Sequence, residues 1–188
     1  MRITAGRLGG RSLVSPDDER VRPTSDKVRQ AIFNVLLHRD FDVGFTLEDA
    51  RVIDLFAGTG ALGIEALSRG ASYTLFVDDA AESRALIRTN VEALALIGVT
   101  KIWRRDATSL GPMAAGAGGP FELAFLDPPY RKGLVARALD SLRDGKWLTP
   151  NAIIVVEMAK DESLPFDDGH RLLDERCYGD TRVALLRS

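Results

Sequence analysis

The sequence has few of the residues that bind metals or form disulfides. Its 188 residues include one cysteine and two histidines. A single cysteine, Cys177, excludes an internal disulfide and a cysteine-based zinc site. The histidines, His38 and His170, lie far apart and lack the spacing of metal ligands. We therefore expect no structural metal, and we interpret Cys177 as a small buried hydrophobic residue.

Long hydrophobic runs are also missing. No apolar stretch approaches the roughly 18 residues of a membrane-spanning helix, and the first ten residues, MRITAGRLGG, lack the apolar core of a secretory signal. Hydrophobic residues make up 45% of the chain and charged residues 28%, as in ordinary globular proteins. The length suits one domain with a small appendage. These features predict a cytoplasmic protein, which we expect to be a monomer.

Charge is unevenly distributed along the chain. The formal net charge is −2, which by itself argues against a nucleic-acid partner. Residues 1–29, however, hold seven cationic and four anionic side chains, so this segment carries +3 and the remainder −5. A basic segment on an acidic body is a candidate phosphate-binding patch. Charge alone does not distinguish such a patch from a solvated surface hairpin.

The order of predicted elements indicates an α/β fold. Residues 2–14 read as two short β-like runs around a Gly9-Gly10 turn, and Thr24 or Ser25 can cap a helix that continues to about Leu37. After residue 50, strands alternate with helices, which predicts a parallel sheet with helices on both faces. An antiparallel hairpin at 171–187 makes this sheet mixed. The other predicted strands are 50–56, 73–78, 101–105, 121–127 and 152–158, and the helices between them are 60–69, one ending near 96, and 134–143.

A glycine-rich turn follows the first of these strands. It reads IDLFAGTGALG from Ile53 to Gly63 and matches the G-x-G-x-x-G pattern of dinucleotide-binding turns. The carboxylate of Asp54 would repel the pyrophosphate of a dinucleotide, at high cost where the dielectric constant is low. S-adenosylmethionine has no phosphate and carries an ammonium and a sulfonium, which a carboxylate attracts. We therefore predict that this turn binds S-adenosylmethionine.

Acidic residues follow the next two predicted strands as well. Asp78 can accept hydrogen bonds from both ribose hydroxyls, and Asp106 can accept one from the adenine amino group. Taken alone, either residue can instead be a helix cap or a turn former. Their position at the ends of consecutive strands favours ligand binding. The predicted cofactor-binding residues are Asp54, Phe56, Ala57, Gly58, Thr59, Gly60, Gly63, Asp78, Asp106 and Ala107.

The predicted strand 121–127 ends in Asp-Pro-Pro-Tyr, residues 127–130. The exocyclic amino group of a nucleobase is a weak nucleophile because its lone pair is delocalised into the ring. The Asp127 carboxylate and the Pro128 carbonyl can accept its two N–H bonds, and Pro129 adds no competing N–H. Tyr130 offers a flat face for a base taken out of its helix. Two prolines alone would only end a strand, but the four residues together predict methyl transfer to an amino nitrogen. Whether Asp127 is a base or only an acceptor stays open.

Several longer segments support a resemblance to a known family. They are RITAGRLGGRSL (2–13), VRPTSDKVRQAIFNVL (21–36), VIDLFAGTGALGIEALSRGA (52–71), FVDDA (76–80) and LDPPYRKG (126–133). Together they are similar to the bacterial 16S ribosomal RNA guanine-N2 methyltransferases, the small-subunit rRNA methyltransferase D type. The resemblance implies a class I S-adenosylmethionine-dependent methyltransferase domain at 24–188, Rossmann-like with a mixed seven-stranded sheet, and a small N-terminal β-hairpin extension at 1–23.

The same resemblance implies a substrate and an RNA-contacting surface. In that family the methylated atom is the N2 of one guanine of 16S rRNA, guanine 966, within the small ribosomal subunit or its assembly intermediate. The segment around Arg22, Thr24 and Arg29 is implied to lie near the cofactor and target; a helix cap and surface charges are the alternative. The predicted RNA-binding residues are Arg2, Arg7, Arg11, Arg22, Thr24 and Arg29.

Three other functions compete with this prediction. A DNA adenine-N6 or cytosine-N4 methyltransferase would also use Asp-Pro-Pro-Tyr, but 188 residues leave no room for a sizeable target-recognition domain. A nicotinamide oxidoreductase is disfavoured by Asp54. A non-catalytic RNA-binding assembly factor that keeps the pocket as a relic is disfavoured by the intact acidic residues Asp54, Asp78 and Asp127.

Overall fold

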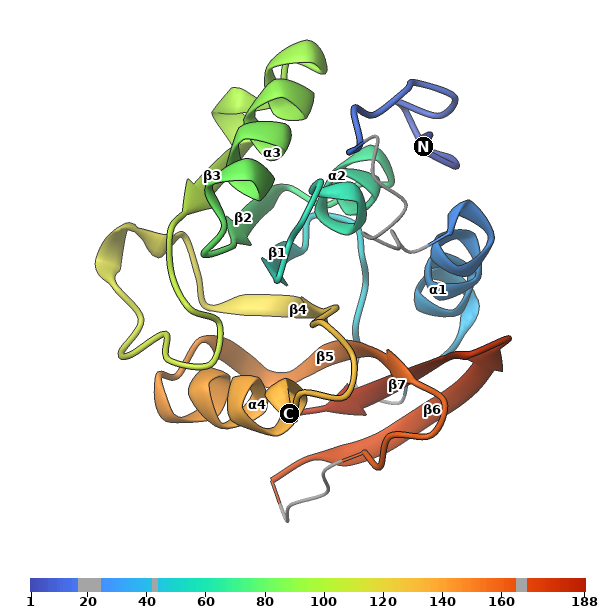
Figure 1. The fold of residues 1–188 in the computed structure, drawn as a ribbon, viewed down its shortest axis with the longest axis vertical. Coiled ribbons are helices and arrows are strands. Elements are labelled where there is room, and N and C mark those ends of the chain that lie inside the picture. The colour runs from blue at the N-terminus through green and yellow to red at the C-terminus, as the bar shows by residue number, and fades with distance from the viewer. Residues whose placement is uncertain (17–24, 42–43, 165–168) are drawn as a thin grey trace.

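The centre of the molecule is a seven-stranded mixed sheet in the order β3-β2-β1-β4-β5-β7-β6 (Figure 1). The computed structural model describes residues 1–16, 25–41, 44–164 and 169–188. Five strands are parallel, namely β1 (Arg51–Leu55), β2 (Tyr73–Val77), β3 (Thr100–Trp103), β4 (Phe121–Leu126) and β5 (Leu148–Ala159). The last two, β6 (Arg171–Tyr178) and β7 (Thr181–Arg187), form an antiparallel hairpin beside β5. The predicted fold class is confirmed.

Helices cover both faces of the sheet because the strand side chains alternate between two apolar clusters. One cluster joins Val52 and Phe125 to buried residues of α1 (Asp26–His38), α2 (Ala61–Ser68) and α3 (Ala81–Ala93). The other joins Ile53 and Leu126 to α4 (Leu134–Asp144) and to the segment after β3. Ser25 caps α1 by accepting a hydrogen bond from the Val28 N–H at 3.2 Å. Thr24, the alternative cap, lies outside the described residues.

The observed structure differs from the sequence prediction in several places. Strand β5 begins at Leu148 rather than 152. Strand β3 ends at Trp103 rather than 105, because it is an edge strand whose pairing with β2 stops there. Helix α3 ends at Ala93, and Ala95 then adopts a left-handed φ of 55° before the short 3-10 helix η1 (Ile97–Val99). Cys177 is exposed on the edge strand β6, so its interpretation as a buried residue is wrong.

The first residues of the chain form a loop against α2, in dark blue in Figure 1, rather than a regular two-stranded hairpin. A single antiparallel bridge joins Arg2 to Ser12. Within this loop, the side chain of Ile3 is buried. A Cβ on Gly6 would lie 1.9 Å from the Ser68 carbonyl oxygen, so only glycine permits this approach. The predicted boundary between residues 23 and 24 lies outside the described residues.

The described helices include none that is long and apolar enough to cross a membrane.

Candidate active site

The predicted site residues meet where the strand order reverses between β1 and β4. Leu55, the last residue of β1, is in register with Val77 of β2 and Leu126 of β4. The residues that follow these three strands therefore emerge side by side at one edge of the sheet. Helix α2 leaves β1 on one face and α4 leaves β4 on the other, which makes this edge the position where open α/β sheets bind ligands.

At three positions of the turn after β1, glycine is suited to the structure for a different reason. Gly60 has a φ of 78° and ends the turn as the N-cap of α2. A Cβ on Gly63 would lie 2.4 Å from Phe76 Cε1, so this glycine allows α2 to pack closely on β2. A Cβ on Gly58 would meet only the Phe56 carbonyl oxygen, at 3.9 Å, which leaves open space beside the backbone. The turn thus presents backbone to a ligand while its far side is packed.

Phe56 is the strained residue of this turn. Its φ of 58° lies in the left-handed region, which is unusual for a bulky side chain. The side chain is half-buried, whereas Ala57 and Thr59 are buried. Asn90 of α3 donates to the Thr59 carbonyl at 3.0 Å. A neighbouring helix thus helps to hold the conformation of the turn.

Asp54 is almost completely buried beneath the turn, with 2% of its surface exposed. Its Oδ2 accepts a hydrogen bond from the Gly63 N–H at 2.9 Å and so caps the first turn of α2 from β1. Burial raises the pKa of Asp54 from 3.8 to about 8, the Gly63 hydrogen bond opposes this rise, and Asp78 adds to it. A buried carboxyl group of this kind favours a cationic ligand, which would stabilise its ionised form.

Asp78 connects the turn to the end of β2. Its two carboxylate oxygens accept hydrogen bonds from the N–H groups of Gly58 and Ala80, each at 2.9 Å. Since each carboxylate oxygen can accept a second bond, both retain acceptor capacity for a ligand hydroxyl. Asp78 is therefore a structural residue of the turn that also fits its predicted role.

Asp106 lies farther from the sheet than predicted. It follows the end of β3 by three residues, and its exposed carboxylate accepts from the Thr108 N–H at 2.8 Å and from the Thr108 hydroxyl at 2.7 Å. These two hydrogen bonds lower the pKa of Asp106. The local arrangement is that of a turn former, with the carboxylate still exposed on the outside of the turn. Ala107 beside it is buried.

The Asp-Pro-Pro-Tyr segment follows β4 directly, next to the glycine turn. Asp127 is half-buried, Pro128 is buried, and Pro129 is exposed. The Tyr130 hydroxyl donates to Glu157 Oε1 at 2.8 Å and lies 3.1 Å from the Thr181 hydroxyl. Burial is the main reason that the pKa of Tyr130 is raised, so its hydroxyl remains protonated. The segment is thus attached to β5 and β7 through the far end of the tyrosine ring.

Glu157 is a residue that the sequence reasoning missed. It lies within the apolar strand β5, where it is 5% exposed. A single acidic residue in the stretch AIIVVEM was the available signal, because charged residues are rarely buried without a partner.

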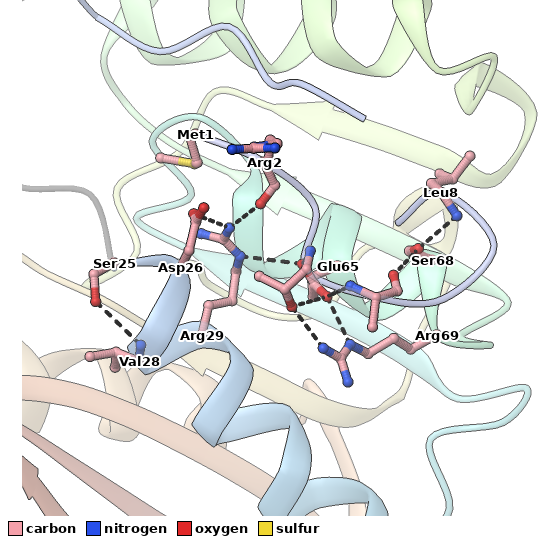
Figure 2. Close-up of polar contacts among 12 residues, drawn as sticks. Met1, Arg2, Leu8, Ser25, Asp26, Val28, Arg29, Glu65, Ser68 and Arg69 are labelled. Atoms are coloured by element: carbon pink, nitrogen blue, oxygen red, sulfur yellow. Dashed lines mark hydrogen bonds and ion pairs between the residues drawn. The ribbon is translucent and has the colours of Figure 1, made fainter. Parts of the chain in front are cut away.

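The predicted RNA-binding residues do not share one environment. Arg2, Arg7 and Arg11 are exposed on the N-terminal loop. Arg29, in contrast, is fully buried, and Figure 2 shows its guanidinium next to Asp26, Glu65 and Arg2. It pairs with Asp26 at 2.7 Å and with Glu65 at 3.3 Å, and it donates to the Arg2 carbonyl. The prediction of an RNA contact for Arg29 is therefore wrong. Arg22 and Thr24 lie outside the described residues.

The buried carboxylate of Glu65 attaches the N-terminal loop to the domain (Figure 2). It accepts hydrogen bonds from the N–H and hydroxyl of Thr4, at 2.8 and 2.7 Å, and from the N–H of Ala5 at 3.0 Å. Arg69, the C-cap residue of α2, donates to it at 2.8 Å. The exposed arginines thus belong to a loop that hydrogen bonds attach to α2.

A model of one protein family matches residues 1–187. The chain belongs to the family described as Conserved hypothetical protein 95. It is 39% identical over 166 residues to ribosomal RNA small subunit methyltransferase D of Escherichia coli K12, covering 88% of this chain and 78% of the relative. It is 34% identical over 188 residues to YlbH, a candidate rRNA methyltransferase of Bacillus subtilis, covering 100% and 98%.

Solved structures agree with this assignment. The structure of yhhF, a candidate methyltransferase from Escherichia coli, matches with a TM-score of 0.81 and 30% identity over 100% of this chain and 97% of that one. The family resemblance seen in the sequence is confirmed, and the fold is that of the class I methyltransferases.

Proposed function

We propose that this protein transfers a methyl group from S-adenosylmethionine to the exocyclic N2 of one guanine of 16S rRNA, guanine 966 by family resemblance. We propose that the substrate is the small ribosomal subunit or its assembly intermediate. The observation that carries the proposal is the adjacency of two sites at the ends of β1 and β4: the glycine turn over Asp54, and the Asp-Pro-Pro-Tyr segment. The name of the Escherichia coli relative supports the rRNA substrate.

The residues around the glycine turn fit S-adenosylmethionine. The cofactor, when bound, supplies a methyl group activated by a positively charged sulfur. Asp54 would attract the cationic end of the ligand, since ionisation of this buried carboxyl is costly without a cation. Asp78 would accept from the ribose hydroxyls, and Gly58 leaves space for close approach of the backbone. The other predicted contacts are Phe56, Ala57, Thr59, Gly60, Gly63, Asp106 and Ala107.

The residues after β4 would orient the guanine. The Asp127 carboxylate and the Pro128 carbonyl would accept the two N–H bonds of the N2 amino group, which favours a tetrahedral nitrogen with an available lone pair. Asp127 would also accept the proton that the nitrogen releases. Tyr130 would stack on the base. Most of the rate increase would come from positioning and from fixed charge near the reacting atoms.

The exposed arginines of the N-terminal loop would bind the rRNA backbone. Because Arg29 is buried, the described residues that this proposal retains are Arg2, Arg7 and Arg11. Phosphate contacts by such side chains position an RNA without reading its sequence. The choice of one guanine would then depend on the shape of the subunit and on the pocket around Tyr130.

The proposal is tested by offering purified protein and labelled S-adenosylmethionine to unmodified small subunits, naked 16S rRNA and duplex DNA. We expect methylation of the subunits, and mass mapping should place the methyl group on one guanine. Asp127→Asn should abolish transfer while the dissociation constant for S-adenosylmethionine, measured by calorimetry, changes little. Asp140→Asn, an exposed carboxylate on α4, is the matched control and should behave as wild type.

Methylation of DNA alone would replace the proposal with a DNA methyltransferase. A complete absence of transfer with tight RNA binding would instead indicate an assembly factor. Loss of cofactor affinity in Asp127→Asn equal to its loss of transfer would contradict the division between the two sites.

A further inference from the structure

Glu157 is a buried carboxylate that the proposed methyl transfer does not use. Val156 of β5 is in register with Leu126 of β4, so Glu157 and Asp127 are adjacent at the same edge of the sheet. A carboxylate with 5% exposure in an apolar strand is costly unless it serves a specific partner. The Tyr130 hydroxyl, 2.8 Å from Glu157 Oε1, is such a partner.

A second contact holds the same loop at the next residue. The Arg131 N–H donates to Glu162 Oε1 at 2.7 Å, and the other oxygen of Glu162 accepts from the Ala159 N–H at the end of β5 at 2.9 Å. Arg131 has a left-handed φ of 59°. The backbone after Tyr130 is therefore attached to the end of β5, while the ring is attached to the interior of the same strand.

These contacts restrain Tyr130 at both ends. The backbone attachment limits where the Cα can lie. The contacts with Glu157 and Thr181 fix the position of the hydroxyl oxygen, and because a phenolic O–H lies in the plane of its ring, they favour one orientation of that plane. A ring that is already ordered loses less conformational entropy when a base stacks on it. It also holds the base in one plane relative to Asp127, which methyl transfer requires.

We propose that Glu157 is a positioning residue that fixes the plane of the Tyr130 ring against which the target base stacks. This inference rests on the proposed function, because it concerns the same base-binding site. Glu157 acts through the tyrosine hydroxyl and does not itself touch the base. The Thr181 hydroxyl supports the same orientation from β7.

The test is a double-mutant cycle on methyl transfer to small subunits. Glu157→Ala should lower kcat/KM for the subunit by about 10- to 100-fold, because the ring is no longer held. Tyr130→Phe keeps the ring and removes the hydroxyl, so it should cause a similar loss. Both single substitutions remove the same hydrogen bond, between the Tyr130 hydroxyl and Glu157. The double variant should therefore have a kcat/KM no lower than that of either single variant. Glu157→Gln should recover most of the activity, because its amide oxygen can still accept from the hydroxyl.

Two controls separate this role from a general structural one. The dissociation constant for S-adenosylmethionine should stay within about twofold of wild type in every variant, since the glycine turn is not altered. Glu122→Ala removes a different half-buried carboxylate, which accepts from the Arg51 N–H at 2.7 Å at the opposite edge of the sheet, and it should not change transfer. Glu157→Gln and Tyr130→Phe introduce side chains close in shape to those of wild type. If Glu157→Ala does not fold, comparison of these two variants tests the role of the hydrogen bond.

Either of two results overturns the inference: additivity of the Glu157→Ala and Tyr130→Phe losses, or wild-type kcat/KM in Tyr130→Phe. If wild-type protein methylates neither subunits nor RNA, the proposed function fails first. If wild type is active and the cycle shows no coupling, only the positioning role fails.

Discussion

Replacement of Glu65 by alanine should destabilise the protein by about 3–5 kcal/mol, the usual cost of removing one partner from a buried ion pair. The carboxylate is fully buried and accepts hydrogen bonds from Thr4, Ala5, Arg29 and Arg69. Among the residues that the structure describes, Asp26, whose side chain is half exposed, then remains paired with the fully buried Arg29 guanidinium. The loss is a large share of the roughly 5–15 kcal/mol by which a typical domain is stable.

Urea unfolding at pH 7 measures this change, with Asp140→Ala as the control. Asp140 pairs with Arg143 on the surface, where both side chains are about half exposed, so its removal should cost less than about 1 kcal/mol. Hydrogen exchange should also show faster exchange of the Thr4 and Ala5 amides in Glu65→Ala. A difference of less than about 1 kcal/mol between Glu65→Ala and wild type would refute the account of this network.

The pH dependence of the same variant provides a second check. Burial opposes ionisation of Glu65, but hydrogen bonds from Thr4 and Arg69 outweigh it and lower its pKa below the ordinary 4.5. Because the pKa of Glu65 is lower in the folded state than in the unfolded state, its ionisation stabilises the protein at any pH above the unfolded-state pKa. This stabilisation is lost as the pH falls through the folded-state pKa. The stability difference between wild type and Glu65→Ala should therefore be constant above about pH 5 and shrink below about pH 4.

Three further predictions concern the turn and the loop. Gly63→Ala should destabilise the protein by about 1–3 kcal/mol in urea unfolding, because its Cβ would overlap Phe76, whereas Gly98→Ala meets open space; equal effects would contradict the packing argument. Asp54 has a folded pKa of about 8 against an ordinary 3.8, so the native state holds a proton that the unfolded state lacks, and stability should fall as the pH rises between these values. Asp54→Asn should remove this dependence of the unfolding free energy on pH, whose slope is at most about 1.4 kcal/mol per pH unit. Parallel plots of unfolding free energy against pH for wild type and Asp54→Asn between pH 5.5 and 7.5 would exclude a raised pKa of Asp54. Arg7→Ala combined with Arg11→Ala should weaken RNA binding and reduce the slope of log affinity against log salt by roughly 1.4, measured by filter binding; an unchanged slope would show that the loop is only a solvated surface.

The sequence predicted the sheet and the glycine turn because their signals are local. Apolar runs, glycines and prolines constrain the backbone wherever they occur, so the strand that contains Asp54 and the strand before Asp127 were found nearly to the residue. Asp106 was placed wrongly relative to its strand because strand length depends on pairing: β3 ends where β2 stops offering a partner. The prediction that Cys177 is buried was wrong for a related reason, because the sequence of β6 does not reveal that it is an edge strand.

Charged residues in apolar surroundings were the least predictable. Arg29 was expected to contact RNA and is buried against Glu65, which is 36 residues away in the chain. Glu157 was not singled out in its strand, although it accepts a hydrogen bond from the tyrosine of the Asp-Pro-Pro-Tyr segment, 27 residues away. In both cases the partner comes from another element, so no spacing rule within one element indicates the pair.

By itself, then, the amino-acid sequence determined which backbone segments become strands, helices and tight turns, and which acidic residues follow the strands. These properties depend on neighbours within a few residues. Only the tertiary structure decided which charged side chains are buried and what they bind, because burial and pairing are set by elements that meet after distant segments pack together. The anchoring of the N-terminal loop by Glu65 and the restraint of Tyr130 by Glu157 belong to this second group.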